Sequence, residues 1–342
     1  MARIFLDEFC EMEYNLRSGI YRTDKVFCEK RGIALPKKLL FIFNNRAGKS
    51  AIERELAGVI DIFTKGGCEV VAHPTQGAGD AMATVRDRGA AYETIVVAGG
   101  DGTLSEAVEG LMAIPEKDKI KLGYIPSGST NDFAASLGIP KDVKAAAELI
   151  VRGKTFKCDI GRFNGRTFNY VAGCGAFTDV SYATPQGNKN MFGYFAYIIE
   201  GLSRLPKLPS YKMCVECDGK RMEGEFILGM VMNSNNIAGI DHGNIIKADL
   251  SDGLFELLLI RTPSNLIELQ MTLGGLLSGK SSKDGLYCIL KGREFKFSTE
   301  DDIKWTLDGD FGGSDKEVTI SVAERAVNFI VAEDNPELLA GS

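Results

Sequence analysis

The stretch TIVVAGGDGTLSEAVEGL, residues 94–111, decides the fold of this chain. It opens on Ile95–Ala98, an apolar run rich in β-branched side chains, which predicts a strand buried on both faces. The glycine-rich sequence GGDGT at 99–103 follows, and apolar residues then recur at helical spacing. The stretch therefore predicts a buried strand, a glycine turn with an acid in its middle, and a helix.

The glycine turn has the features of a phosphate site. Glycines allow positive φ and let a ligand approach bare backbone N–H groups, while the start of a helix favours an anion. Asp101 would repel a phosphate unless a cation or a proton lay between them, so the turn predicts a nucleotide held with a divalent metal. Packing alone would also explain glycines in a tight turn. We expect Thr103 and Glu106 to form a capping box at the helix start.

The composition is that of a soluble globular protein. The length of 342 residues favours about two domains, and 44% of the residues are hydrophobic and 25% charged. A net charge of −6 argues against nucleic acid as the main partner. No run reaches the ~18 apolar residues that span a bilayer, and the acidic N-terminus does not predict a signal peptide. Eight scattered cysteines fit free thiols in a reducing cytoplasm.

Strands and helices alternate in the first half of the chain. Alternation at this spacing predicts βαβ units and a parallel, doubly wound sheet, whose ligands bind at the carboxyl ends of the strands. Besides the unit at 94–111, the pattern predicts strands at 39–44 and 68–75 and helices at 51–65, 79–88 and 143–152.

Beyond about residue 155 the pattern changes to short alternating segments separated by Asn-Gly and Asp-Gly turns, which predicts a mostly antiparallel β domain. Helices near 192–205 and 266–277 interrupt it, and the final segments EVTISV and VNFIVAE could be strands of either domain. The predicted organisation is an extension at 1–36, an α/β nucleotide-binding domain at 37–155, a β-rich substrate domain at 156–332 and a tail at 333–342.

Three further loops fall at predicted strand ends. The sequence FNNRAGKS at 43–50 ends like a P-loop, but Phe43 stands where a P-loop needs its first glycine, so a looser nucleotide turn is favoured. The loop at 74–80 offers the hydroxyl of Thr75, although a plain loop explains it equally well. The fourth loop, PSGSTNDFA at 126–134, repeats the glycine–hydroxyl–helix order, with Ser129 or Thr130 as the expected N-cap and Asp132 in the first turn.

These motifs together resemble the diacylglycerol kinase catalytic-domain family, and within it the soluble bacterial lipid kinases. The resemblance covers about 38–332. GGDGT alone is shared with NAD kinases and phosphofructokinases, but its combination with the GSTNDFA loop and two late Asp-Gly segments is specific. The matching segments are NNRAG at 44–48, Thr75, GGDGTLSEAVEGL at 99–111, PSGSTNDFA at 126–134, KADLSDGLFEL at 247–257 and WTLDGDFGG at 305–313.

The resemblance implies a Rossmann-like α/β domain followed by an antiparallel β-sandwich domain. It implies a structural magnesium ion held by Asp249, Asp252 and the carbonyl of Leu254, a set of oxygen ligands suited to that ion; a plain Asp-Gly turn is the alternative. It also implies that ATP contacts one group of residues in the α/β domain. These are Asn44, Asn45, Arg46, Ala47, Gly48, Thr75, Gly100, Asp101, Gly102, Thr103, Leu104, Ser105, Glu106 and Ser129.

Two departures from the family pattern concern the expected catalytic loops. The family's general base is the Glu of a DGE segment, and this chain has Asp310 in that position, one methylene shorter. The acceptor hydroxyl must therefore come closer, or a water must bridge. Asn45 replaces the proline of the family's NP, which affects only the stiffness of that loop. Asp310 as base and Asp101 in the network of acid, water and metal are the expected catalytic residues.

The expected activity is Mg²⁺-dependent transfer of the γ-phosphate of ATP to a lipid hydroxyl, with diacylglycerol as the first acceptor and phosphatidic acid as the product. A cytoplasmic protein that binds membranes reversibly fits this activity. The sequence does not determine whether the protein forms a homodimer. The aromatic stretch at 190–212 predicts a helix that either lies at the bilayer surface or packs into the β domain. A soluble-metabolite kinase of the NAD kinase sort and a non-catalytic nucleotide-binding relative are the alternatives.

Overall fold

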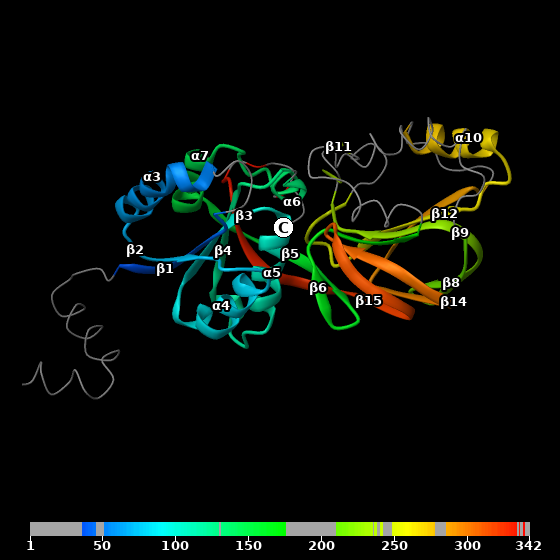
Figure 1. The fold of residues 1–342 in the computed structure, drawn as a ribbon, viewed down its shortest axis with the longest axis horizontal. Helices are drawn as coiled ribbons and strands as arrows, with labels where there is room; N and C mark the ends of the chain where they lie inside the picture. Colours follow the sequence, from blue (N-terminus) through cyan, green and yellow to red (C-terminus); the bar gives the residue numbers. More distant parts are fainter. Residues whose placement is uncertain are drawn as a thin grey trace, which may run out of the picture.

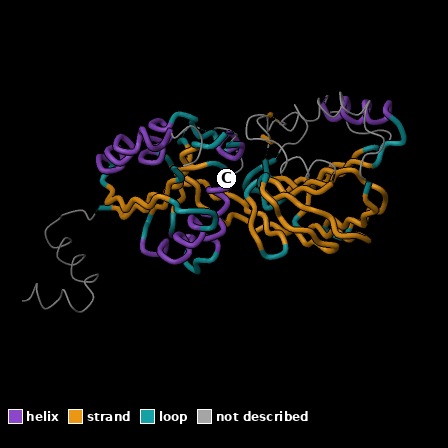
Figure 2. The backbone as a smooth tube through the Cα atoms, in the orientation of Figure 1, coloured by secondary structure: helices purple, strands orange, loops and turns teal. Residues whose placement is uncertain are grey.

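The molecule consists of two halves that lie side by side, one rich in helices and one built almost entirely of strands (Figures 1 and 2). The helical half comes first in the chain, and the strand-rich half follows. The computed structural model describes residues 36–45, 51–129, 131–175, 210–234, 236–237, 240–241, 248–277, 285–333, 335 and 338.

Four parallel strands in the order β2-β1-β3-β4 form the sheet of the helical half. Helices α3 and α7 lie on one face and α4 and α5 on the other, which explains why β3 is apolar along its whole length (Figure 1). The elements are β1 (Lys37–Phe43), α3 (Ala51–Lys65), β2 (Cys68–Pro74), α4 (Asp80–Arg88), η1 (Gly89–Ala91), β3 (Thr94–Gly99), α5 (Asp101–Met112), η2 (Lys117–Lys119), β4 (Lys121–Pro126), α6 (Asp132–Ser136) and α7 (Val143–Arg152).

Local sequence accounts for these elements. In α7, for example, the carboxylate of Asp142 accepts a hydrogen bond from the N–H of Ala145 at 2.9 Å and so caps the helix. The buried side chains of α7 recur at helical spacing, from Val143 to Ile150. The predicted helices at 51–65 and 143–152 are confirmed, and that at 79–88 begins one residue later.

The strand-rich half is antiparallel, with one helix, α10, among its described residues. This confirms the helix predicted at 266–277, whereas the helix predicted near 192–205 lies outside the described residues. The elements are β5 (Lys154–Phe163), β6 (Arg166–Phe168), β7 (Val171–Gly175), β8 (Tyr211–Cys217), β9 (Lys220–Met232), β10 (Asn236–Ile237), β11 (Ile240–Asp241), β12 (Phe255–Arg261), α10 (Leu266–Leu277), β13 (Tyr287–Gly292), β14 (Glu294–Leu307) and β15 (Asp310–Val331).

The last strand, β15, joins the two halves into one hydrogen-bonded sheet. Its 22 residues pair with β14 near its start, with β5 along its second part, and with β4 in parallel at Asn328 and Phe329. The segments EVTISV and VNFIVAE, left open by the sequence, therefore form one strand that serves both halves. Between Ala323 and Val327 the pairing of β15 with β5 shifts in register.

Two hydrophobic cores stabilise the halves, and the second lies inside a curled sheet. Trp305 is buried between Phe163 and Phe297, with ring centroids 5.1 and 4.9 Å apart. Phe168 of β6 and Phe255 of β12 are also in ring contact at 5.8 Å, although several strands separate β6 from β12 in the sheet. The antiparallel strands therefore curl until their inner faces meet. No helix among the described residues is long and apolar enough to cross a bilayer.

Candidate active site

The two glycine turns of the helical half touch each other at the carboxyl ends of β3 and β4. These strands pair in parallel so that Gly99 lies beside Pro126, and the N–H of Ser127 donates to the carbonyl of Gly99 at 2.8 Å. A Cβ added at Gly128 would lie 2.5 Å from the Cα of Gly100. Only glycine fits there, and the contact leaves backbone free of side chains at the strand ends, the position at which open α/β sheets bind ligands.

The other two nucleotide loops begin at the same edge of the sheet. The N–H of Asn44 donates to the carbonyl of Ala98, and the N–H of Thr75 donates to the carbonyl of Phe43, both at 2.9 Å. Asn44 and Thr75 therefore stand level with the glycine turn. Arg46, Ala47 and Gly48 lie outside the described residues.

Asp101 is the first residue of α5 and is buried at the junction of the two glycine turns. Its Oδ2 accepts a hydrogen bond from the N–H of Asp132 at 3.2 Å. Burial and then the nearby charge of Asp132 raise the pKa of Asp101 to about 7. A cation placed here would favour the charged carboxylate, so the chemistry of this acid pair fits a divalent metal.

The predicted capping box is wrong. Gly100 is the N-cap residue of α5, and Thr103 Oγ1 accepts instead from Asn44 Nδ2 at 3.3 Å. Glu106 turns away from its own helix and accepts from the N–H groups of Gly79 and Ala81, at 2.8 and 3.2 Å. The two polar side chains hold neighbouring loops in place, so tertiary contacts replaced the local pattern.

The fourth loop also differs from its prediction in one respect. Asn131, rather than Ser129 or Thr130, is the N-cap residue of α6, with a left-handed φ of 54°. Its Oδ1 accepts from the N–H of Gly128 at 2.9 Å, and its Nδ2 donates to the carbonyl of Gly128 at 2.9 Å. Ser129 is left exposed at the tip of the turn, and Asp132 lies in the first turn of α6 as expected.

Asp310 reaches this site from the strand-rich half. It begins β15, directly after the turn at Asp308 and Gly309. A Cβ added at Gly102 would lie 2.9 Å from Asp310 Oδ2, so this carboxylate lies against the backbone of the GGDGT turn. The structure thus brings Asp101 and Asp310, which are 209 residues apart in the sequence, to the same turn.

Asp308, two residues earlier, has a different environment. It is buried, and its carboxylate accepts hydrogen bonds from Ser105 Oγ at 2.6 Å and from three backbone N–H groups. The backbone donors, at 2.7, 3.0 and 3.2 Å, are Asn169, Tyr170 and Val171. Burial raises the pKa of Asp308, against the four hydrogen bonds that lower it. The residue ties α5 to the strand-rich half, a role that the sequence did not predict.

The turn expected to hold magnesium is rich in oxygen ligands. Asp249 Oδ1 accepts from the N–H and the hydroxyl of Ser251, and Asp252 Oδ1 accepts from the N–H of Leu254 at 2.9 Å. A third acid, Asp159, faces the same turn, because its Oδ2 accepts from the N–H of Gly253 at 2.6 Å. Hard oxygen donors of this kind fit magnesium.

A lysine forms ion pairs with two acids in or next to this turn, one of which is an expected magnesium ligand. Lys291 Nζ lies 3.2 Å from Asp252 Oδ2 and 2.9 Å from Glu256 Oε1. Burial raises the pKa of Glu256 to about 7, against the lowering effect of Lys291. Among the described residues, no group of three or more His, Cys, Asp or Glu side chains is arranged to hold a metal ion. A magnesium ion here would depend on the backbone carbonyl of Leu254 as well as on the two aspartates.

Comparisons with known proteins identify relatives of this chain. The family model of the diacylglycerol kinase catalytic domain matches residues 38–163. The chain is 34% identical over 279 residues to the diacylglycerol kinase of Bacillus subtilis, covering 81% of this chain and 91% of that protein. It is 35% identical over 278 residues to that of Staphylococcus aureus, covering 81% and 87%. The chain belongs to the diacylglycerol kinase catalytic-domain family.

As a member of this family the chain is a kinase, and the resemblance carried by its motifs is confirmed. Its fold is that of a diacylglycerol kinase crystal structure from Bacillus anthracis str. Sterne, with a TM-score of 0.69 and 22% sequence identity. That likeness covers 87% of this chain and 97% of the other. It extends over both halves of the molecule.

Proposed function

We propose that this chain is an ATP-dependent lipid kinase that transfers the γ-phosphate of ATP to the hydroxyl of diacylglycerol and releases phosphatidic acid. One observation carries the proposal. Asp310, from the strand-rich half, lies against the turn at 99–103, and the glycines of that turn pack against a second glycine turn within the helical half. A donor phosphate on the turn and an acceptor hydroxyl beside Asp310 would therefore meet.

ATP is held at the edge of the parallel sheet. The bare backbone of Gly100, Gly102 and Gly128 suits phosphate groups, which need N–H donors and close approach more than they need side chains. Asn44 and Thr75 stand level with these turns, and Asn44 already contacts Thr103. The proposed nucleotide contacts are Asn44, Asn45, Arg46, Ala47, Gly48, Thr75, Gly100, Asp101, Gly102, Thr103, Leu104, Ser105, Glu106 and Ser129.

Magnesium fits two places in this chain. Asp101 would hold it at the phosphates, where it supplies charge neutralisation for the transferred group. Asp249, Asp252 and the carbonyl of Leu254 would hold a second, structural ion. Both assignments rest on oxygen donors, and the raised pKa of Asp101 indicates a site that lacks positive charge.

Asp310 serves as the general base. The acceptor hydroxyl oxygen forms a bond to the γ-phosphorus, the bond from that phosphorus to the β-phosphate oxygen breaks, and ADP leaves with the electron pair. The hydroxyl proton passes to the Asp310 carboxylate late in the transfer, since such transition states are loose. Asp308 is unsuited to this task because its carboxylate is buried and accepts four hydrogen bonds.

The lipid acceptor is reached from a membrane surface. We propose a cytoplasmic protein that associates reversibly with the bilayer and contributes to phospholipid biosynthesis. The aromatic stretch at 190–212, of which only 210–212 lie among the described residues, remains the proposed contact.

Transfer of labelled γ-phosphate from Mg-ATP to a panel of lipids in mixed micelles tests the proposal, with NAD as a separate acceptor. Label on diacylglycerol is the expected result, and label on another lipid would correct the acceptor alone. Label on NAD only would make the chain a soluble-metabolite kinase. ATP binding without transfer to any acceptor would indicate a non-catalytic relative. The replacement of the family's glutamate by Asp310 would then be the first explanation to test.

A further inference from the structure

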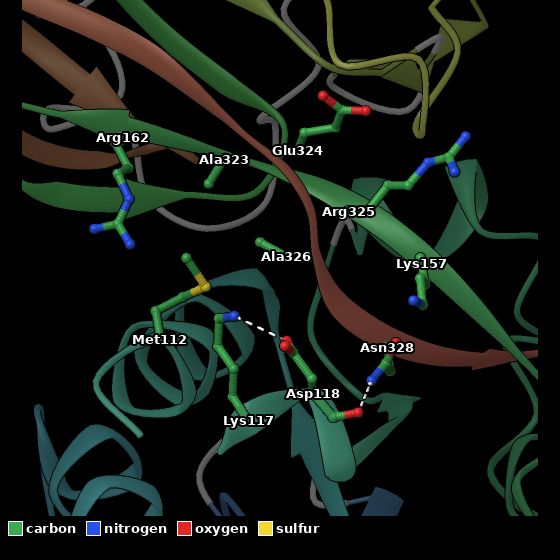
Figure 3. Close-up of a pocket in the computed structure, with 10 residues that line it drawn as sticks. All are labelled: Met112, Lys117, Asp118, Lys157, Arg162, Ala323, Glu324, Arg325, Ala326 and Asn328. Atoms are coloured by element: carbon green, nitrogen blue, oxygen red, sulfur yellow. Dashed lines mark hydrogen bonds and ion pairs between the residues drawn. The ribbon is translucent and has the colours of Figure 1, made fainter. Parts of the chain in front are cut away.

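A second pocket lies at the far end of α5 from the GGDGT turn. Helix α5 begins at Asp101 and ends at Met112, so its two ends are about 18 Å apart. Met112 lines a pocket of about 280 Å³ between η2, β5 and β15, shown in Figure 3. The residues around it are Met112, Lys117, Asp118, Lys157, Arg162, Ala323, Glu324, Arg325, Ala326 and Asn328.

The charge of this pocket is opposite to that of the whole chain. Four of the lining side chains are basic and two are acidic, which leaves an excess of two positive charges in a chain whose net charge is −6. Both acids are already in ion pairs. Asp118 Oδ1 lies 3.0 Å from Lys117 Nζ, and Glu324 Oε2 lies 3.0 Å from Nη1 of Arg293, which is outside the lining set.

Three basic side chains remain after these pairs are counted. No carboxylate of the described residues forms an ion pair with Lys157, Arg162 or Arg325. Arg325 Nε donates to the carbonyl of Ser251 at 3.2 Å, which holds one edge of its guanidinium. The carboxylate of Asp159 lies behind the pocket, where its Oδ1 accepts from the backbone N–H of Arg325 at 2.6 Å. Within the described part of the chain the three basic side chains themselves form no ion pair, so the pocket keeps an excess of positive charge.

A local irregularity of the sheet lies among the residues that line this pocket. Lys157 and Arg162 are five residues apart on β5, and regular strand alternation would point them to opposite faces. The pairing of β5 with β15 shifts in register between Ala323 and Val327, opposite this part of β5, and Arg325 has a left-handed φ of 49° within the shift. Bulges of this kind redirect side chains and are typical of binding sites.

We propose that this pocket binds the phosphate group of an anionic ligand. A guanidinium matches two phosphate oxygens with its planar fork, and an ammonium supplies a point charge beside it. The volume admits a phosphate with a small organic group. The same chemistry fits a soluble phosphomonoester and the headgroup of an anionic phospholipid, and the inference does not depend on the proposed function.

The first experiment uses inorganic phosphate as the probe and the full chain as the protein. Thermal unfolding is followed as phosphate is added, with sodium chloride as the control at equal ionic strength. The wild type is compared with Lys157→Ala/Arg162→Ala and with Lys220→Ala, an exposed lysine at the β8–β9 turn. Phosphate that binds at the glycine turns stabilises all three proteins alike, so the difference between them reports on the pocket.

The double variant is expected to need about tenfold more phosphate for the same stabilisation, because each charge-assisted hydrogen bond contributes strongly. Lys220→Ala should match the wild type, and Arg162→Lys should retain part of the effect. Circular dichroism checks that each variant folds. If the double variant does not fold, Lys157→Ala, which alters an exposed side chain, carries the comparison alone.

The second arm distinguishes the two sources of the phosphate group. Sedimentation with vesicles of equal parts phosphatidylcholine and phosphatidic acid, against phosphatidylcholine alone, tests the lipid headgroup. Loss of vesicle binding in the double variant, with no change in the response to free phosphate, would assign the pocket to a headgroup. A weaker response to free phosphate in the double variant, with unchanged vesicle binding, would assign the pocket to a soluble phosphomonoester. Equal behaviour of wild type and double variant in both arms would overturn the proposal.

Discussion

Two glycine turns that contain aspartates, one from each half of the molecule, differ in how their aspartates and backbone contact the rest of the protein. In the turn at 99–103 the glycines bring bare backbone against a second glycine turn, and Asp101 lies at their junction. In the turn at 308–310 the first acid is enclosed by four hydrogen-bond donors. The first turn offers backbone to a ligand, whereas in the second turn Asp308 accepts N–H groups from the protein itself.

An aspartate beside a glycine therefore has no fixed role in this molecule. Asp308 and Asp310 are two residues apart and carry the same functional group, yet one is buried as an anchor and the other lies against Gly102. The donors that surround Asp308 determine this difference. We assign the chemistry to Asp310 because its side chain is exposed and lies against the GGDGT turn, and substitutions can test this assignment.

The largest effect is expected from Asp310→Asn. Loss of the proposed base should lower kcat by about 10²–10⁴-fold while ATP binding stays near that of the wild type, since the amide keeps the shape of the side chain. Transfer assays in mixed micelles and ATP titrations measure the two quantities. Asp302→Asn, an exposed acid on β14, is the matched control. Wild-type turnover in Asp310→Asn would show that the base lies elsewhere.

Asp308→Ala should lower the free energy of unfolding, because Asp308 anchors the structure and is not the proposed base. The substitution leaves buried N–H groups of Asn169, Tyr170 and Val171 without their acceptor, at a cost of about 3 kcal/mol or more in the free energy of unfolding. Urea unfolding measures it, and Asp302→Ala should change the value by less than about 0.5 kcal/mol. If the two variants were equally stable, the anchoring role would be refuted.

Gly128→Ala tests the contact between the two glycine turns. The added Cβ would lie 2.5 Å from Gly100 Cα and 2.8 Å from Asn131 Oδ1, so the turns must separate. A displacement of this kind is expected to lower kcat/KM for ATP by about 10²-fold. Gly274→Ala in α10 is the control, because a Cβ there meets no atom within 4 Å. Equal kinetics of the two variants would mean that ATP does not use this contact.

The sequence predicted much of the helical half because its signals there are local. The strand and helix repeats, and the meeting of loops at one edge of a parallel sheet, follow from periodicity and from the geometry of βαβ units. The two halves meet through contacts that no local signal encodes. Ser105 Oγ donates to Asp308 across the two halves, and the two residues are 203 positions apart. Within the helical half, too, Glu106 contacts Gly79 although its spacing from Thr103 fits a capping box.

The same limit applies to the strand-rich half. Alternation identified its strands, but the register shift at Arg325 and the gathering of basic side chains around it depend on the pairing of β5 with β15. The exposed acid Asp310 was found only because its segment resembled a family motif. Physical patterning in the sequence would not distinguish it from Asp308, since distant parts of the chain bury Asp308 and leave Asp310 exposed.

The effect that is smallest per step of the measured variable is expected in the pH dependence of stability, measured without metal in the presence of a chelator. The pKa of Asp101 is raised by burial to about 7 from its ordinary 3.8, so the folded state binds this proton more tightly than the unfolded chain does. Stability should therefore fall as the pH rises from about 4 to about 7, with a slope on the order of 1 kcal/mol per pH unit at most.

Urea unfolding of the wild type and of Asp101→Asn across this range isolates the contribution, because other titrating groups are common to both proteins. The wild type should lose stability relative to the variant as the pH rises, and the two curves should run parallel above about pH 7. Magnesium with ATP should reduce the difference at neutral pH, since a cation favours the charged carboxylate. Parallel curves over the whole pH range would mean that the pKa of Asp101 is close to that of an exposed aspartate. Burial at the GGDGT turn would then affect this acid less than the structure indicates.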